Sequence, residues 1–136
     1  MNLSLKAFSF VFLGTFASFS NASDNEETKA SRFLYCANVS QFYYQYFLKH
    51  EPNSNNVSTY RITRDNFRLA AVATKSFPDS QSFAFENDAA LKKVIAILER
   101  EKTENVDLLS SENKSCAETM IKDVIPLLKP KNTQAN

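Results

Sequence analysis

The chain has 136 residues and a formal net charge of +1, and it contains two cysteines, one histidine and one glycine. Because the single glycine is Gly14, the chain beyond it lacks the glycines of a P-loop, a dinucleotide-binding turn or a nucleophile elbow. A charge this close to zero also argues against a nucleic-acid partner, since phosphate contacts need an excess of basic residues.

The first 22 residues have the features of a secretory signal peptide. Lys6 precedes an apolar run of 13 residues, 7–19, and small residues at Ser20 and Ala22 suit cleavage after Ala22. The run is shorter than the ~20 residues that a membrane-spanning helix needs. We therefore expect an exported protein with no integral membrane segment in the mature chain, periplasmic in a Gram-negative cell and otherwise secreted.

Cleavage would leave 136 − 22 = 114 residues, the size of one domain. The mature chain would lose Lys6, so 16 − 1 = 15 basic residues would balance 15 acidic ones. We predict a signal peptide at residues 1–22, one helical domain at residues 23–128 and a tail at residues 129–136. The tail, KPKNTQAN, is polar and is expected to be disordered.

Hydrophobic periodicity predicts a first helix over residues 29–50, which ends before a proline. Its segment QFYYQYFLKH places five aromatic rings in six positions, too many for one narrow contact stripe. Tyr43 and Phe47 project at the centre of the apolar face and are expected in the core. Phe42 and Tyr44 project at opposite edges, where they either cover seams to neighbouring helices or contact a partner.

The second helix is expected from Ser58 or Thr59 to Phe77, and one side of it is basic. Such a stripe on a nearly neutral protein can bind an acidic partner or an anionic polymer. The alternative is a solvated face whose surface ion pairs contribute little. The candidate partner-binding residues of this helix are Arg61, Arg64, Arg68 and Lys75.

Two more helices are expected, one from Asn87 or Asp88 to Asn105 and one over residues 111–128. Pro126 should kink or end the last helix. The residues of the last helix expected to face inward are Cys116, Ala117, Met120, Ile121, Val124, Ile125 and Leu128.

Cys36 and Cys116 are the only cysteines, and an exported protein is expected to join them in one disulfide. In a simple up-down-up-down bundle, the early parts of the first and fourth helices lie at opposite ends. We therefore predict an all-α, single four-helix domain whose first and fourth helices are linked by this disulfide. The arrangement needs either a crossover connection through residues 78–86 or orthogonal packing.

No combination of residues points to catalysis. His50 is the only histidine, so it has neither a second histidine nor a free cysteine with which to hold zinc. A serine triad would need a nucleophile that nothing singles out, and the carboxylates fall on helix faces expected to be exposed. We therefore expect no catalytic residues, no metal, no cofactor and no enzymatic activity.

Two functions remain. The first is a small exported helical interaction protein, such as an inhibitor, an immunity protein or an envelope-assembly factor, with a protein partner in the envelope or outside the cell. The second is a periplasmic carrier or chaperone that binds apolar ligands or unfolded chains, in a groove between helices lined by Phe42, Tyr44, Phe83 and Phe85. One disulfide-linked helical domain behind a signal peptide is similar in architecture to bacterial periplasmic immunity proteins and acid-stress chaperones. The sequence leaves the oligomeric state open.

Overall fold

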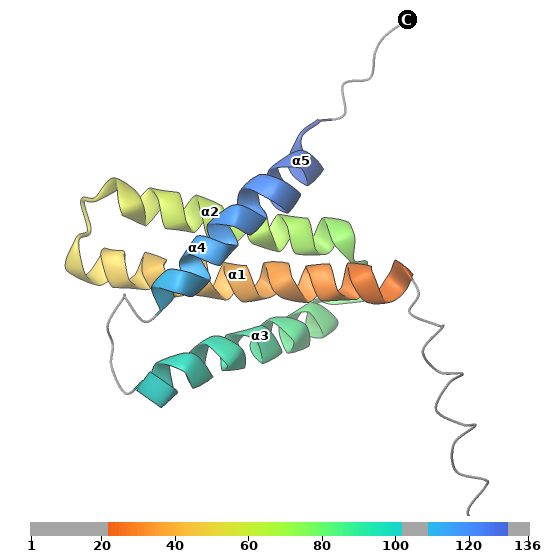
Figure 1. The fold of residues 1–136 in the computed structure, drawn as a ribbon, viewed down its shortest axis with the longest axis horizontal. Helices are drawn as coiled ribbons and strands as arrows, with labels where there is room; N and C mark the ends of the chain where they lie inside the picture. The colour runs from red at the N-terminus through yellow and green to blue at the C-terminus, as the bar shows by residue number, and fades with distance from the viewer. Residues whose placement is uncertain (1–21, 102–108, 131–136) are drawn as a thin grey trace, which may run out of the picture.

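The structure is a computed structural model that describes residues 22–101 and 109–130, with side chains from Lys29 onward. The described residues are helical and contain no strand, which confirms the all-α class. Residues 1–21 of the expected signal peptide and residues 131–136 of the expected tail lie outside the described part. The elements are α1 (Ala22–His50), α2 (Asn55–Thr74), α3 (Ser80–Glu101), α4 (Ser110–Thr119), a π-helical turn (Met120–Val124) and α5 (Ile125–Leu128) (Figure 1).

Helices α1, α2 and α3 begin earlier than the periodicity predicts, and for α2 and α3 the reason is a polar cap that precedes the apolar residues. The hydroxyl of Ser54 accepts the backbone N–H of Asn56 at 3.1 Å and starts α2 at Asn55. The carboxylate of Asp79 accepts the backbone N–H of Ser82 at 2.7 Å at the start of α3. The prediction of a long connection over residues 78–86 was therefore wrong, since most of that segment is helix.

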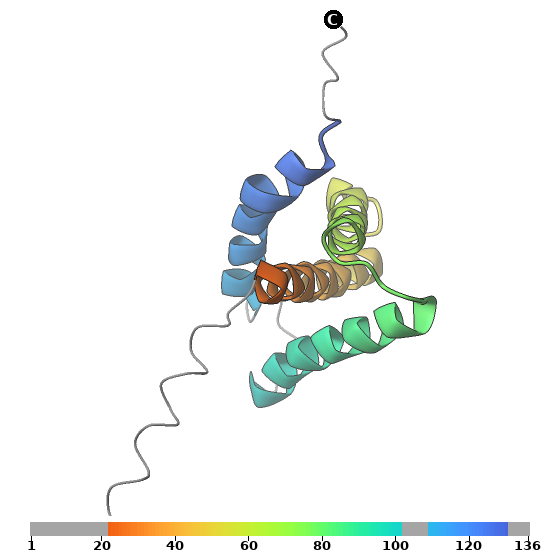
Figure 2. The ribbon, with the colours of Figure 1, turned by 90° about the vertical axis from the view of Figure 1, so that its right-hand side faces the viewer.

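Helix α1 lies at the centre of the fold. It contacts α2, α3 and α4, whereas α3 contacts α1 and no other described helix. Figure 2 shows α3 on one side of α1, and α2 together with the α4–α5 segment on the other. Residues 36–40 of α1 are all buried, including the polar Asn38 and Ser40. Because five successive residues cover the whole circumference of a helix, this part of α1 has neighbours on every side.

Two aromatic residues of α1, Phe33 and Tyr43, are in the core, and Tyr35, Phe42 and Phe47 are half-buried and pack against it. Tyr43 is buried and stacks on Tyr60 of α2 with 5.0 Å between ring centroids. Phe47 stacks on the same ring at 5.7 Å, and Phe33 lies 6.4 Å from Phe67. These contacts form the interface between α1 and α2, which run in opposite directions after the short turn at residues 51–54.

The disulfide forms between Cys36 and Cys116, whose Cα atoms are 5.4 Å apart. Helix α4 crosses α1 steeply, and this geometry brings the two cysteines together (Figure 1). The prediction that the first and fourth helices are linked is confirmed. The link is made by this oblique crossing and not by a crossover connection through residues 78–86, because α3 already begins at Ser80.

The last helix buries a narrower face than expected. Cys116, Met120 and Val124 form the stripe that contacts the rest of the domain, and Ile121 is 70% exposed. Ile125 and Leu128 are exposed as well, so placing them inside was wrong. The reason is that α4 lies across α1 at the edge of the domain, where no described helix covers its outer side. The chain continues through Pro126 for its final turn and ends as a helix at Leu128.

The disulfide should contribute a large part of the stability, because it closes a long loop in the unfolded chain. For Cys36→Ala combined with Cys116→Ala, we expect the free energy of unfolding to fall by about 3–4 kcal/mol. Urea denaturation followed by circular dichroism measures this loss. Reductant should lower the stability of the wild type and leave the double variant unchanged. A loss below about 1 kcal/mol would show that packing alone holds α4 on α1.

Candidate interaction surfaces

Arg64, a predicted partner-binding residue, already makes three contacts within the protein. Its Nε donates to Oδ1 of Asp65 at 2.8 Å, and its Nη1 donates to Oε1 of Gln41 on α1 at 2.8 Å. The guanidinium also lies over the ring of Tyr44, 5.2 Å from its centroid. The side chain is only 17% exposed, so Arg64 helps to join α2 to α1.

Arg68 lies one turn further along α2 and is much less well paired. It is half-buried, and its buried Nε has no hydrogen-bond partner. Burial lowers the pKa of Arg68, the positive charge of Arg64 lowers it further, and Asp65 raises it. Arg68 is therefore a partly desolvated cation beside a second cation.

The two remaining basic residues of the predicted stripe differ from this pair. Arg61 is exposed and contributes to the positive field around Asp65. The pKa of Asp65 is lowered chiefly by its hydrogen bond from Arg64. Lys75 forms an ion pair with Glu86 of α3 and lies 5.5 Å from the ring centroid of Phe77. The predicted stripe thus divides into two parts. Arg61, Arg64 and Arg68 form a charge cluster with Asp65 on α2, whereas Lys75 connects the end of α2 to α3 through its ion pair.

The two edge aromatics of α1 lie on different surfaces. Phe42 packs against the core and meets the ring of Tyr43 edge-on at 5.6 Å. Tyr44 lies beneath the guanidinium of Arg64. Both are half-buried, so each covers a seam between α1 and its neighbours. Projection at 100° per residue separates them by about 200°, so one partner surface is not expected to include both.

A groove that the sequence did not reveal runs along α3 where it packs on α1. Its central depression has a volume of about 270 Å³, and depressions of about 370 and 330 Å³ adjoin it at either end. The first neighbour shares Phe85 and Glu86 with it, and the second shares Ser31 and Lys93. We call the central depression the α3 groove, which is lined by Ser31, Phe85, Glu86, Ala89, Ala90 and Lys93.

Phe85 is the most exposed large apolar residue described, with 77% of its surface accessible. The sequence named Phe85 as a possible lining of a groove for apolar ligands, but placed it in a connection over residues 78–86 rather than on the surface of a helix. The sequence does contain a signal for the start of this helix, because Asp79, a residue that often caps helices, follows directly after Pro78.

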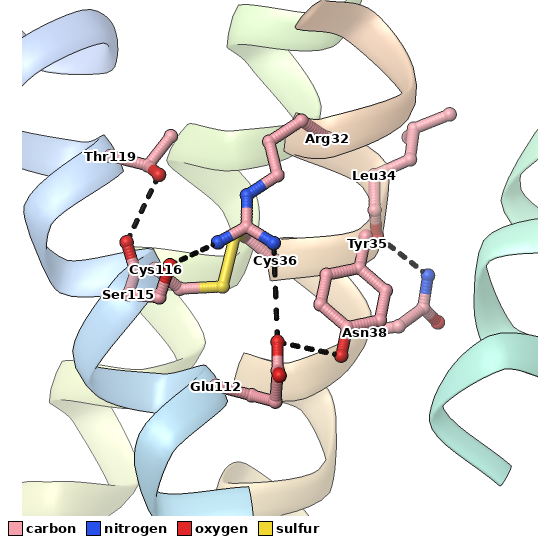
Figure 3. Close-up of a disulfide and its surroundings, with 9 residues drawn as sticks. All are labelled: Arg32, Leu34, Tyr35, Cys36, Asn38, Glu112, Ser115, Cys116 and Thr119. Carbon is pink, nitrogen blue, oxygen red and sulfur yellow. Dashed lines mark hydrogen bonds and ion pairs between the residues drawn. A yellow bond between two sulfur atoms is a disulfide. The ribbon is translucent and has the colours of Figure 1, made fainter. Parts of the chain in front are cut away.

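A polar cluster around the disulfide borders the far end of the groove (Figure 3). The phenol of Tyr35 donates to Oε2 of Glu112 at 2.9 Å, and Arg32 donates to the hydroxyl of Ser115 at 2.6 Å. Arg32 also lies 4.0 Å from the Glu112 carboxylate and 5.4 Å from the centroid of the Tyr35 ring. These side chains connect α1 to α4 beside the Cys36–Cys116 bond, so the cluster is explained by the packing of the two helices.

The described residues contain neither a cluster of metal ligands nor a helix that could span a membrane. In residues 22–101 and 109–130, no three side chains of His, Cys, Asp or Glu come together as metal ligands. His50 is exposed at the end of α1, with its ring 4.6 Å from that of Tyr46. None of the helices described here combines the length and apolarity needed to cross a membrane.

Comparison with known proteins identifies no relative of this chain. No protein-family model, no curated protein and no solved structure matches the chain.

The hydrogen bond between Tyr35 and Glu112 should be detectable as a raised pKa of the Tyr35 phenol. Burial, the hydrogen bond to Glu112 and the charge of that carboxylate raise the pKa of Tyr35 from 10.0 to about 12. Because the folded pKa lies above the unfolded one, this stabilisation is complete below pH 10 and is lost as the pH rises towards 12.

Absorbance at 295 nm follows phenol ionisation in the wild type and in the Tyr35→Phe variant. The difference between the two titrations should report one phenol with a pKa of about 12. A difference centred near pH 10 would contradict the Tyr35–Glu112 contact.

Proposed function

We propose that this protein is an exported helical interaction protein, an inhibitor, immunity protein or envelope-assembly factor that binds a protein partner through the α3 groove. The observation that carries the proposal is the exposure of Phe85. Helix α3 buries Ala90 and Val94 on its inner side, so its packing is satisfied without Phe85. A large aromatic residue exposed beside a shallow groove is typical of the anchor of a protein interface.

The groove is held in shape by polar contacts beneath it. Asn38 of α1 is buried and donates to Oδ1 of Asn87 on α3 at 3.0 Å and to the backbone carbonyl of Leu34 at 2.8 Å. This bridge fixes α3 on α1 before any partner binds. A preorganised surface loses less conformational entropy on binding, which favours affinity.

The shape of the groove supports a macromolecular partner. Its depressions, of about 270–370 Å³, are open to solvent, whereas a small-molecule site encloses most of its ligand. Ser31, Ala89 and Ala90 give it a floor of small side chains, on which a partner's main chain can approach closely. The disulfide supports an exported location, because such bonds persist in oxidising compartments.

A carrier or chaperone for unfolded chains is the second candidate, and one observation favours it. Apolar residues are exposed on other helices too, including Ile62 and Leu69 on α2 and Ile121 on the last helix. Several separate apolar contacts suit a binder of unfolded chains. In that case the protein should suppress the aggregation of a reduced, unfolded test protein, and no single surface residue should control the effect.

The interaction function is tested by capture with three tagged forms of the mature protein: wild type, Phe85→Ser and Ile62→Ser. The bait is exposed to the envelope fraction and culture fluid of the producing cell. Ile62→Ser is the matched control, because Ile62 is 54% exposed on α2 and does not line the α3 groove. The wild type and Ile62→Ser should capture the same protein at a stoichiometric level.

Phe85→Ser should bind that protein about 30-fold more weakly or worse, since an interface anchor contributes about 2 kcal/mol or more. The melting temperature should change little, because Phe85 is mostly exposed. Equal capture by all three forms would rule out the α3 groove as the binding surface. Capture of nothing, together with suppressed aggregation of the test protein, would favour the chaperone function.

A further inference from the structure

A second surface, separate from the α3 groove, combines several positive charges with little compensation. Arg64 and Arg68 lie one turn apart on the side of α2 beside α1, and Arg61 extends the same row. Asp65 is the acidic residue that interacts with all three arginines. Three cations against one anion leave a local excess of two positive charges on a chain whose formal net charge is +1.

The two guanidinium groups differ in how they are held. Arg64 is oriented by Asp65, by Gln41 and by the ring of Tyr44, so its position is fixed in the free protein. The Nε of Arg68 is buried and has no hydrogen-bond partner among the described residues. A buried donor without a partner costs free energy, and the neighbouring positive charge of Arg64 adds to that cost.

We propose that Arg64 and Arg68 form a receptor site for a carboxylate, supplied by an aspartate or glutamate side chain of the protein partner. The inference rests on the proposed interaction function and adds the chemistry of one contact. A guanidinium group donates two parallel hydrogen bonds to a carboxylate, and such charge-assisted bonds are among the strongest in proteins. A carboxylate beside both groups would offset their mutual repulsion, and it would bind the terminal nitrogens of Arg68, because the buried Nε is out of reach of a partner.

The fixed position of Arg64 in the free protein favours the binding of a carboxylate. Arg64 does not have to be immobilised on binding, because the contacts to Gln41 and Tyr44 hold it in place. Arg68 supplies a second guanidinium group beside it, whose positive charge is offset only in part by Asp65. Arg68 is therefore the residue to change, since replacing Arg64 would also break contacts between α1 and α2.

The variant Arg68→Met keeps the apolar stem of the side chain and removes the guanidinium group. Without any anion, its melting temperature should equal or exceed that of the wild type, because an unpaired donor and a repulsion are both removed. An arginine that merely supports the fold would give the opposite result. A lower melting temperature for Arg68→Met would therefore overturn the proposal.

Binding is measured with an acetylated and amidated tetraglutamate peptide at 0.15 M salt, using nuclear magnetic resonance of the arginine Nε–H groups. The peptide should shift the Nε–H signals of Arg64 and Arg68, and binding to Arg68→Met should be at least 10-fold weaker. The matched control is Lys92→Met, which removes one exposed charge on α3 and should change the affinity less than 2-fold. Equal weakening by both variants would show unspecific attraction and overturn the site.

Inorganic phosphate, titrated separately under the same conditions, distinguishes the two anions that a guanidinium pair can recognise. Tighter binding of phosphate than of the peptide would overturn the assignment to a carboxylate. The capture experiment with Phe85→Ser does not involve Arg68. A failure of the carboxylate site can therefore be told apart from a failure of the interaction function.

Discussion

Five successive residues of α1, from Cys36 to Ser40, are buried, and the rest of the fold follows from covering this segment on every side. Helix α2 supplies aromatic rings on one side, α4 is joined on another by the disulfide, and α3 is held on a third by the Asn38–Asn87 hydrogen bond. Residues 36–40, surrounded in this way, cannot contact a partner. The surfaces available to a partner therefore lie on the neighbouring helices and on the parts of α1 outside this segment, such as Ser31.

The neighbours are anchored to different degrees, and this difference determines where function is expected. Helix α4 is connected to α1 by the covalent bond and by the contacts of Arg32 and Tyr35. Helix α3 contacts α1 and no other described helix, so one side of it remains open along the groove that Phe85 borders. The steep crossing of α4 leaves its outer side uncovered, which explains why Ile121 is exposed.

Periodicity and cysteine usage predicted the helical class, the approximate positions of the helices and the disulfide. They could not predict how many neighbours each helix face would have, so Ile121 and Ile125 were placed inside although no described helix covers them. The start of α3 was missed because Asp79 was not recognised as its cap. Spacing placed Arg64 and Arg68 on one side of α2, yet only the tertiary contacts show that the first is paired and the second is not.

The central claim, that α1 is the common support and α3 depends on it alone, is tested most directly by native-state hydrogen exchange. Amides of residues 36–40 should exchange only through global unfolding, together with the buried part of α2 around Phe67. Amides of α3 should exchange through a local opening of lower free energy, because α1 is the one described helix that it packs on, apart from the ion pair of Glu86 with Lys75 at the end of α2. Equal exchange free energies for α3 and α1 would contradict this account.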